Sequence, residues 1–194
     1  MHQAYIELNG VQTKITTWGR WIEESSSVIE DIVIIVTGNP GVSGFYDLFA
    51  KTIHEKLGYS VWCIGHAGHD LPPTKIPLPK LKTHGELYGL QGQIKHKNIR
   101  ALIKPGVLRR VFFLAFEEMD QVKQRNDEAI KRNIKKIKLY YGMNDGWAPG
   151  SFCDRIKTDI PNIDAQVCPY DHVFVFKNSV EIADIVSDWI KAKQ

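Results

Sequence analysis

The stretch Ile32-Val33-Ile34-Ile35-Val36, followed at once by Thr37-Gly38-Asn39-Pro40-Gly41, sets the architecture that we expect for this chain. Its run of β-branched residues predicts a strand buried on both faces, as in a parallel sheet. The glycine- and proline-rich residues predict a tight turn after it. A helix is expected over residues 45–57, closed by Gly58, and a strand over residues 61–64. This order predicts a right-handed crossover between parallel strands, and therefore an α/β fold.

The flanking segments extend this prediction. Residues 5–8 and 11–15 are separated by Asn9-Gly10, which predicts a β-hairpin with a two-residue type I′ turn. Downstream, the pattern predicts a proline-rich loop over 70–79, helices over 85–103 and 111–133, a strand over 137–141, a helix over 152–158, a strand over 165–168 and a helix over 180–192. We therefore expect one α/β domain over residues 1–194, with a mostly parallel sheet and an N-terminal hairpin.

Composition excludes several classes of protein. The chain has 194 residues, 43% of them hydrophobic, which is enough for one globular core. A net charge of +3 and spread-out basic residues argue against a nucleic-acid partner. Three cysteines without metal-ligand spacing fit reduced thiols in an intracellular compartment, with no metal site and no cofactor. The N-terminal residues lack the apolar core of a cleaved signal, and no apolar run is long enough to span a membrane.

The turn at residues 37–41 is a candidate oxyanion-binding loop, formed by Gly38, Asn39 and Gly41. A backbone N–H in such a turn can stabilise the oxyanion of a tetrahedral intermediate. Since Pro40 has no N–H, the donor would be the Asn39 amide or a neighbouring one. The alternative is a plain βα turn, which requires the same residue types.

Asp145 and His172 are candidates for an acid and a base. Asp145 follows the predicted strand 137–141, and His172 comes 27 residues later, after the predicted strand 165–168. A carboxylate at the end of a strand can fix the tautomer of a histidine, which then acts as a general base. Individually, Asp145 also fits a turn residue, and His172 a surface residue.

No nucleophile completes this set. The motif G-x-S-x-G of a nucleophile elbow occurs nowhere in the chain. In Gly65-His66-Ala67-Gly68-His69 an alanine takes the place of the serine, and the second glycine comes one residue early. Ser43 and Cys63 are alternative nucleophiles that geometry disfavours. Four histidines lie within 31 residues but lack the spacing of a metal site. We expect them in loops or on helix surfaces: His66, His69, His84 and His96.

The longer motifs resemble the lipid droplet-associated hydrolase family. The similar segments are residues 36–46, 62–69, 88–97, 140–149 and 171–174, within a match over about residues 4–98 and 111–194. The resemblance implies an α/β-hydrolase fold and a serine esterase acting on lipid esters such as sterol esters. It assigns the acid role to Asp145 and the base role to His172, and it implies a location at lipid droplets and the endoplasmic reticulum.

The chain departs from this family after the segment at 88–97. In the family the nucleophile elbow follows shortly, whereas here the chain continues into residues 98–110 and then into a helix that belongs later in the family's order. We interpret this as a junction at about 98–110 that omits the central strand, the nucleophile, the next strand and the lid-like region thought to dock on droplets. The chain is then expected to be inactive or nearly so, and to leave the strand at 32–36 with an unpaired edge. Without the docking region the cytosol is the alternative location, and a non-catalytic lipid- or partner-binding module is the alternative function.

Overall fold

The computed structural model describes residues 1–8, 11–25, 30–70 and 104–192. These residues form two compact units. Unit 1 contains residues 1–121 and 179–194, and unit 2 contains residues 122–178. The predicted hairpin turn at residues 9–10, nearly all of the loop at 70–79 and the predicted helix at 85–103 lie outside the described residues.

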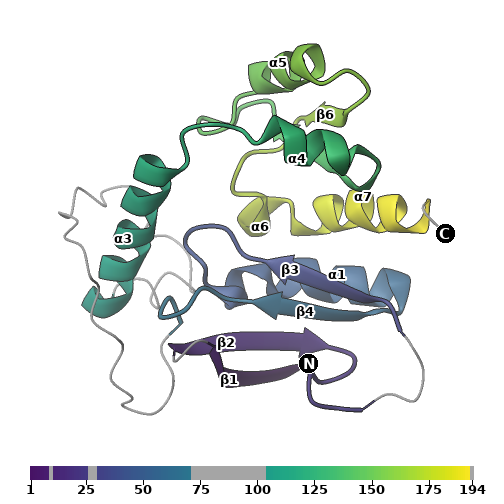
Figure 1. Ribbon diagram of the computed structural model, residues 1–194. Helices are drawn as coiled ribbons and strands as arrows, with labels where there is room; N and C mark the ends of the chain where they lie inside the picture. The colour runs from purple at the N-terminus through teal and green to yellow at the C-terminus, as the bar shows by residue number, and fades with distance from the viewer. Residues whose placement is uncertain (9–10, 26–29, 71–103, 193–194) are drawn as a thin grey trace. The chain divides into compact units, whose positions relative to one another are not determined.

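Unit 1 is built on a four-stranded sheet in the order β1-β2-β4-β3, shown in Figure 1. β1 (His2–Leu8) and β2 (Val11–Trp18) pair antiparallel with Leu8 opposite Val11, which confirms the predicted hairpin pairing. β3 (Ile32–Val36) and β4 (Ser60–Ile64) pair parallel, which confirms the predicted crossover. Because β2 also pairs antiparallel with β4, the sheet is mixed and not mostly parallel as predicted.

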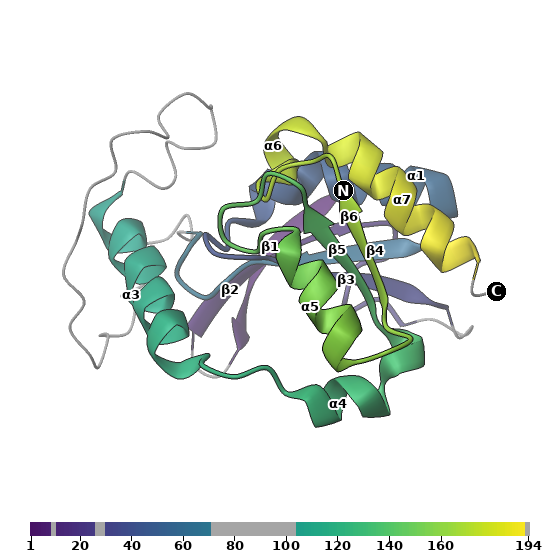
Figure 2. The same ribbon diagram turned by 90° about the horizontal axis from the view of Figure 1, so that it is seen from above.

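Two helices pack together within unit 1. A 3₁₀ turn (Ser43–Tyr46) leads into α1 (Asp47–Leu57), and Gly58 ends the helix with a left-handed φ of 72° and an N–H that donates to the His54 carbonyl. α7 (Ser179–Lys191) packs along α1, as Figure 2 shows from above. The α1 and sheet residues that are almost fully buried form the core: Ile15, Ala50, Ile53, Val61 and Cys63.

β3 is less buried than its sequence predicts. Ile35 is buried, but Ile34 is 56% exposed and Val36 is 74% exposed. The prediction of burial on both faces is therefore wrong. Successive side chains of a strand point to opposite faces, and the face that carries Ile34 and Val36 is left exposed, while Ile35 on the other face is buried. The position of β3 as the last strand, with β4 as its sole neighbour among the described strands, adds to this exposure.

The predicted long helix at 111–133 is two helices. α3 (Pro105–Gln121) ends well before α4 (Asp127–Arg132) begins. The Asn126 side chain accepts a hydrogen bond from the Ala129 N–H at 3.0 Å and caps the start of α4. An asparagine is a strong N-cap, and this local bond starts a new helix where the apolar spacing predicted a continuous one.

Unit 2 is a small α/β layer. β5 (Lys138–Gly142) and β6 (Asp164–Cys168) are parallel and are connected through α5 (Ser151–Asp159). Each of these elements begins and ends within one residue of its predicted position. A 3₁₀ turn (Ile134–Lys136) precedes β5, and the short α6 (Phe174–Lys177) follows β6. The core of the unit consists of apolar residues from α5, the loop after it and β6: Cys153, Ile156, Ile160, Ile163 and Ala165. Within the described parts of both units, no helix is long and apolar enough to cross a membrane.

Candidate functional site

Most amide groups of the turn at residues 37–41, hereafter the 37–41 turn, are engaged inside unit 1. The Gly38 N–H donates to the Tyr46 hydroxyl at 2.9 Å. The Gly41 N–H donates to Nδ1 of His69 at 2.9 Å, and this bond is buried. The Asn39 N–H has no acceptor among the residues that the structure describes. Of the three amides predicted to line an oxyanion loop, the Asn39 amide is thus the one left for an external acceptor.

Two histidines from the loop after β4 hold this turn. Nε2 of His66 lies 2.7 Å from the Thr37 carbonyl, and the His66 backbone N–H donates to the Gly41 carbonyl at 2.8 Å. Since a carbonyl only accepts, the His66 ring must carry a proton on Nε2. His69 is only 2% exposed and accepts from Gly41. The prediction that His69 lies on a loop or helix surface is therefore wrong.

Burial keeps the His69 ring neutral. It lowers the pKa of His69 from 6.5 to about 4, and the neighbouring His66 adds to this, while a hydrogen bond with the Arg110 backbone acts in the opposite direction. A neutral imidazole keeps the Nδ1 lone pair that the Gly41 N–H requires. Chain order places His66 and His69 after β4, at the same sheet edge as the 37–41 turn, but it does not show which backbone groups of the turn they bind.

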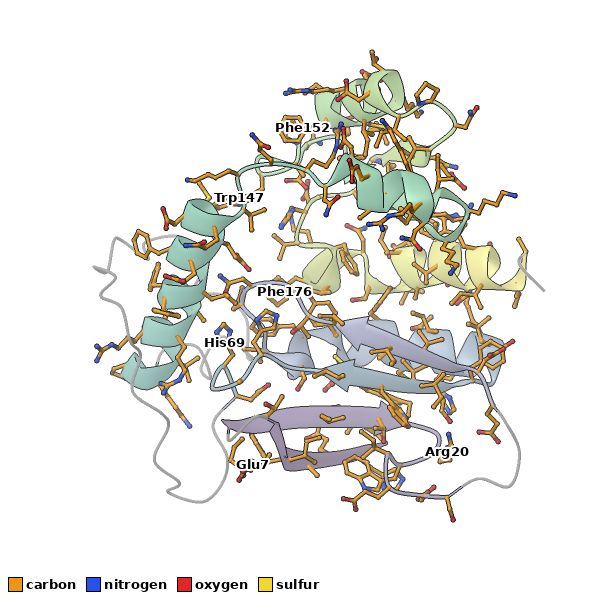
Figure 3. All side chains as sticks on the ribbon, in the orientation of Figure 1. Glu7, Arg20, His69, Trp147, Phe152 and Phe176 are labelled. Carbon is orange, nitrogen blue, oxygen red and sulfur yellow. The ribbon has the colours of Figure 1, made fainter. Side chains whose placement is uncertain are left out.

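α3 also contacts the 37–41 turn. The Asn39 side-chain amide donates to the Val111 carbonyl at 3.1 Å. On the neighbouring loop, a Cβ added to Gly68 would come within 2.3 Å of the Arg110 side chain. Figure 3 labels His69 at the end of the sheet that faces α3. α3, the first helix described after residue 70, thus occupies the immediate surroundings of the turn.

Neither alternative nucleophile is accessible. Ser43 is fully buried, and its N–H and hydroxyl donate to Oδ2 of Asp70 at 3.0 and 3.2 Å. Cys63 is also fully buried, and burial, followed by the charges of Asp47 and Asp70, raises the pKa of its thiol to about 12. Burial keeps substrate away from both groups, and the raised pKa keeps the Cys63 thiol protonated at neutral pH, so neither side chain is placed to act as a nucleophile.

Unit 2 brings Asp145 and His172 together. Oδ2 of Asp145 lies 2.7 Å from Nδ1 of His172. The other oxygen, Oδ1, accepts from the backbone N–H groups of Trp147 at 2.7 Å and Ala148 at 2.9 Å. The Met143 N–H donates to the Cys168 carbonyl at 2.7 Å, which links the segments that follow the parallel strands β5 and β6. Parallel pairing places both strand ends at one edge, and this is why the two side chains meet.

The surroundings of Asp145 favour its charged form. Burial acts to raise the pKa of Asp145, but the hydrogen bonds from Ala148, His172 and Trp147 together leave it lowered. The His172 side chain is 53% exposed, and its Nε2 has no partner among the described residues. Because the carboxylate accepts at Nδ1, it holds the tautomer in which Nε2 carries a free lone pair. Such a pair is arranged to take a proton at Nε2.

Exposed apolar side chains flank this pair. Met143 and Trp147 lie within two residues of Asp145, and Phe152 lies in the first turn of α5; all three are exposed. Figure 3 labels Trp147 and Phe152. In the described parts of the chain, no cluster of three or more histidine, cysteine or acidic side chains is arranged to hold a metal ion.

Comparisons with known proteins match this chain along most of its length. A family model described as lipid-droplet associated hydrolase matches residues 30–104 and, in a second segment, residues 97–175. The lipid droplet-associated hydrolase of Drosophila melanogaster is 30% identical over 303 residues, which cover 98% of each chain. The protein of that name from Gallus gallus is 22% identical over 308 residues, covering 98% of this chain and 95% of its own.

The lengths of these alignments differ from the length of the chain. This chain has 194 residues, so more than a third of the positions in the Drosophila alignment have no residue of this chain opposite them. Among solved structures, a predicted CIB-like hydrolase from Thermoplasma acidophilum is similar with a TM-score of 0.52 and 16% identity, covering 98% of both chains. That likeness supports an α/β-hydrolase-like fold.

Proposed function

The chain belongs to the lipid droplet-associated hydrolase family, and from this membership we propose that it is a shortened, non-hydrolytic member that keeps the acid and base of a serine lipid esterase. In this proposal Asp145 is the acid, His172 is the base, and Gly38, Asn39 and Gly41 belong to the oxyanion loop. The observation that carries the proposal is the 2.7 Å contact between Asp145 and His172 in a chain without a G-x-S-x-G motif.

The proposed shortening lies at about residues 98–110. It is supported by the two segments of the family match, which overlap only at residues 97–104. The position of β3 at the end of its sheet also supports it, since a central strand would otherwise pair with that edge. The segment omitted is proposed to contain the nucleophile strand, the next strand and a lid-like apolar region.

The chemistry follows from what remains. An ester hydrolase of this type needs a hydroxyl whose proton passes to the histidine as the oxygen attacks the carbonyl. The chain has no G-x-S-x-G motif, and therefore no elbow serine whose hydroxyl could pass its proton to His172. Two of the three oxyanion-loop amides, those of Gly38 and Gly41, already donate to internal acceptors. Lipid ester hydrolysis by this route is therefore expected at a residual level only.

The proposed ligands and location come from the family. The family name points to lipid droplets. We propose that the site descends from one that recognised a lipid ester. Since the lid-like docking region belongs to the proposed omission, droplet association is expected to be weaker than that of the Drosophila relative, with the cytosol as the alternative location. Fractionation of cells that express both proteins compares the two directly.

Covalent labelling tests the catalytic part of the proposal. A fluorophosphonate probe reacts with an activated serine, so we expect no labelling of this chain and strong labelling of the Drosophila relative treated in parallel. The variant His172→Ala should leave the background signal of this chain unchanged. Robust labelling that His172→Ala abolishes would overturn the proposal, because it would require an activated nucleophile outside a G-x-S-x-G motif.

A second candidate function is a non-catalytic module that binds a lipid or a partner protein. The exposed Trp147 and Met143 beside the acid–base pair favour it, since exposed apolar clusters mark binding surfaces. A cooperatively melting protein should then show a shift of Trp147 fluorescence with a lipid ester analogue, and Trp147→Ala should weaken binding several-fold. No binding by folded protein would eliminate this second function.

A further inference from the structure

One hydrogen-bonding edge of β3 has no partner among the strands that the structure describes. The Thr37 N–H donates to the Ile64 carbonyl at 3.5 Å, and backbone groups alternate in direction along a strand. The N–H and C=O groups of Val33 and Ile35 therefore point toward β4, whereas those of Ile32, Ile34 and Val36 point away from it. In the described strands nothing pairs with β3 on that side.

The edge lacks the features by which proteins protect edge strands. Proteins commonly place lysine, proline or a bulge on an exposed edge. β3 consists of isoleucine and valine alone, and Ile34 and Val36 expose their side chains on the same face of the sheet. An apolar strand with unpaired backbone groups favours the addition of another strand.

The charged residues next to β3 favour antiparallel pairing with β3 of a second copy of the chain. Glu30 and Asp31 precede β3, and Thr37 and Gly38 follow it. If two copies of β3 pair antiparallel about Ile34, then Ile32 faces Val36, and Asp31 faces the uncharged Thr37. In a parallel, in-register pair, Asp31 would face Asp31, and like charges directly opposite are destabilising.

We propose that two copies of this chain associate through antiparallel pairing of their β3 edges, with Ile34 on the two-fold axis. Such an interface is isologous and closes at two copies, since each chain offers one β3 edge. It joins the two four-stranded sheets into one continuous sheet. A five-residue strand buries far less than the roughly 1,600 Å² of a standard interface, so the dimer dissociates on dilution.

Sedimentation velocity over a concentration series tests the association. The wild-type chain should shift from monomer to dimer as concentration rises. Ile34→Lys places two ammonium groups opposite each other and should raise the dissociation constant at least tenfold. Gln3→Lys adds the same charge on the exposed outer strand β1 and should behave as wild type. A wild-type chain that stays monomeric, forms larger assemblies instead of dimers, or responds equally to both variants overturns the proposal.

Cysteine cross-linking tests the register. In the proposed dimer the two Ile34 residues form a hydrogen-bonded pair with Cα atoms about 5.5 Å apart, which suits a disulfide. The two Val36 residues are offset by four positions, roughly 13 Å along the strand. Ile34→Cys should therefore give covalent dimers under mild oxidation, while Val36→Cys, which is at least as exposed, should not. The wild-type chain, whose three cysteines are buried, is the background. Equal cross-linking at both positions indicates parallel pairing and overturns the proposal.

Discussion

Nδ1 of His69 lies 2.9 Å from the backbone nitrogen of Gly41, 28 positions earlier in the chain, and the bond between them is buried. This contact joins the loop after β4 to the turn after β3. It also defines the protonation state of His69, because a ring nitrogen that accepts an N–H cannot carry a proton. The conformation of the 37–41 turn thus depends on the side chain of His69, which is not one of the proposed acid, base or oxyanion-loop residues.

Substitution of His69 should destabilise unit 1. His69→Ala leaves the Gly41 N–H buried without an acceptor, which costs about 1–3 kcal/mol, and it adds a cavity. His69→Asn offers a side-chain oxygen near the position of Nδ1 and should recover part of the loss. Urea unfolding of both variants measures this difference. Equal losses for alanine and asparagine would show that volume, and not the hydrogen bond, accounts for the effect.

Acid should weaken the fold through the same residue. The pKa of His69 is about 4 in the folded protein, against 6.5 for an ordinary histidine. Between these values the unfolded chain binds more protons, so the free energy of unfolding falls as pH decreases from 6.5 to 4 and this contribution levels off below 4. The loss is at most about 3.4 kcal/mol, which is 1.36 kcal/mol for each unit of the pKa difference. Unfolding curves at several pH values should show this slope in the wild type but not in His69→Asn, where carboxylate titration remains as the common background.

The sequence predicted elements better than it predicted burial. The hairpin, the crossover from β3 to β4 and the two strands of unit 2 follow from residue periodicity and turn residues, which are local signals. The prediction that β3 is buried on both faces was wrong because the run Ile32–Val36 does not show which other elements cover or pair with the strand. The prediction of one long helix was wrong because the Asn126 side chain caps the start of a second helix, where the apolar spacing predicted a continuous one.

The same division applies to the candidate site. Chain order was enough to propose Asp145 and His172, because each follows its own strand and the strands are parallel. The roles of His66 and His69 depend on which backbone groups of the 37–41 turn face them. Such contacts join loops nearly 30 residues apart, and no local pattern reports them.

The tautomer of His172 is a measurable consequence of its contact with Asp145. The carboxylate accepts at Nδ1, so the neutral ring should carry its proton there. Asp145→Asn places an amide beside the ring, whose N–H group can donate to Nδ1 and shift the proton to Nε2. ¹⁵N NMR of the histidine side chains at alkaline pH should show the two nitrogen signals of His172 exchange their character. Unchanged signals in Asp145→Asn would contradict the 2.7 Å contact.

The cysteines should be unreactive in the native protein. All three are free and buried, and the pKa of Cys63 is raised to about 12. A thiol reacts through its thiolate, so burial and a raised pKa both slow alkylation. Iodoacetamide at neutral pH should modify almost none of the thiols before unfolding and all three afterwards. Rapid modification of Cys63 in folded protein would indicate that the layer between α1 and the sheet opens readily.

The close approach of Gly41 and His66 gives the sharpest test of the 37–41 turn. A Cβ at Gly41 would lie 2.3 Å from the His66 ring, whereas a Cβ at Gly44 would meet no heavy atom within 4 Å. Gly41→Ala should therefore destabilise the protein by about 1–3 kcal/mol, as overpacked cores do, and Gly44→Ala by less than about 0.5 kcal/mol. A Cβ at Gly41 would also lie 2.4 Å from the Cβ of His66, so the whole side chain has to be removed, and Gly41→Ala/His66→Gly should restore part of the loss. Thermal melts of Gly41→Ala, Gly44→Ala, His66→Gly and the double variant complete the cycle. Strict additivity would mean that the ring does not contact the turn, and it would contradict the arrangement in which His66 holds both Thr37 and Gly41.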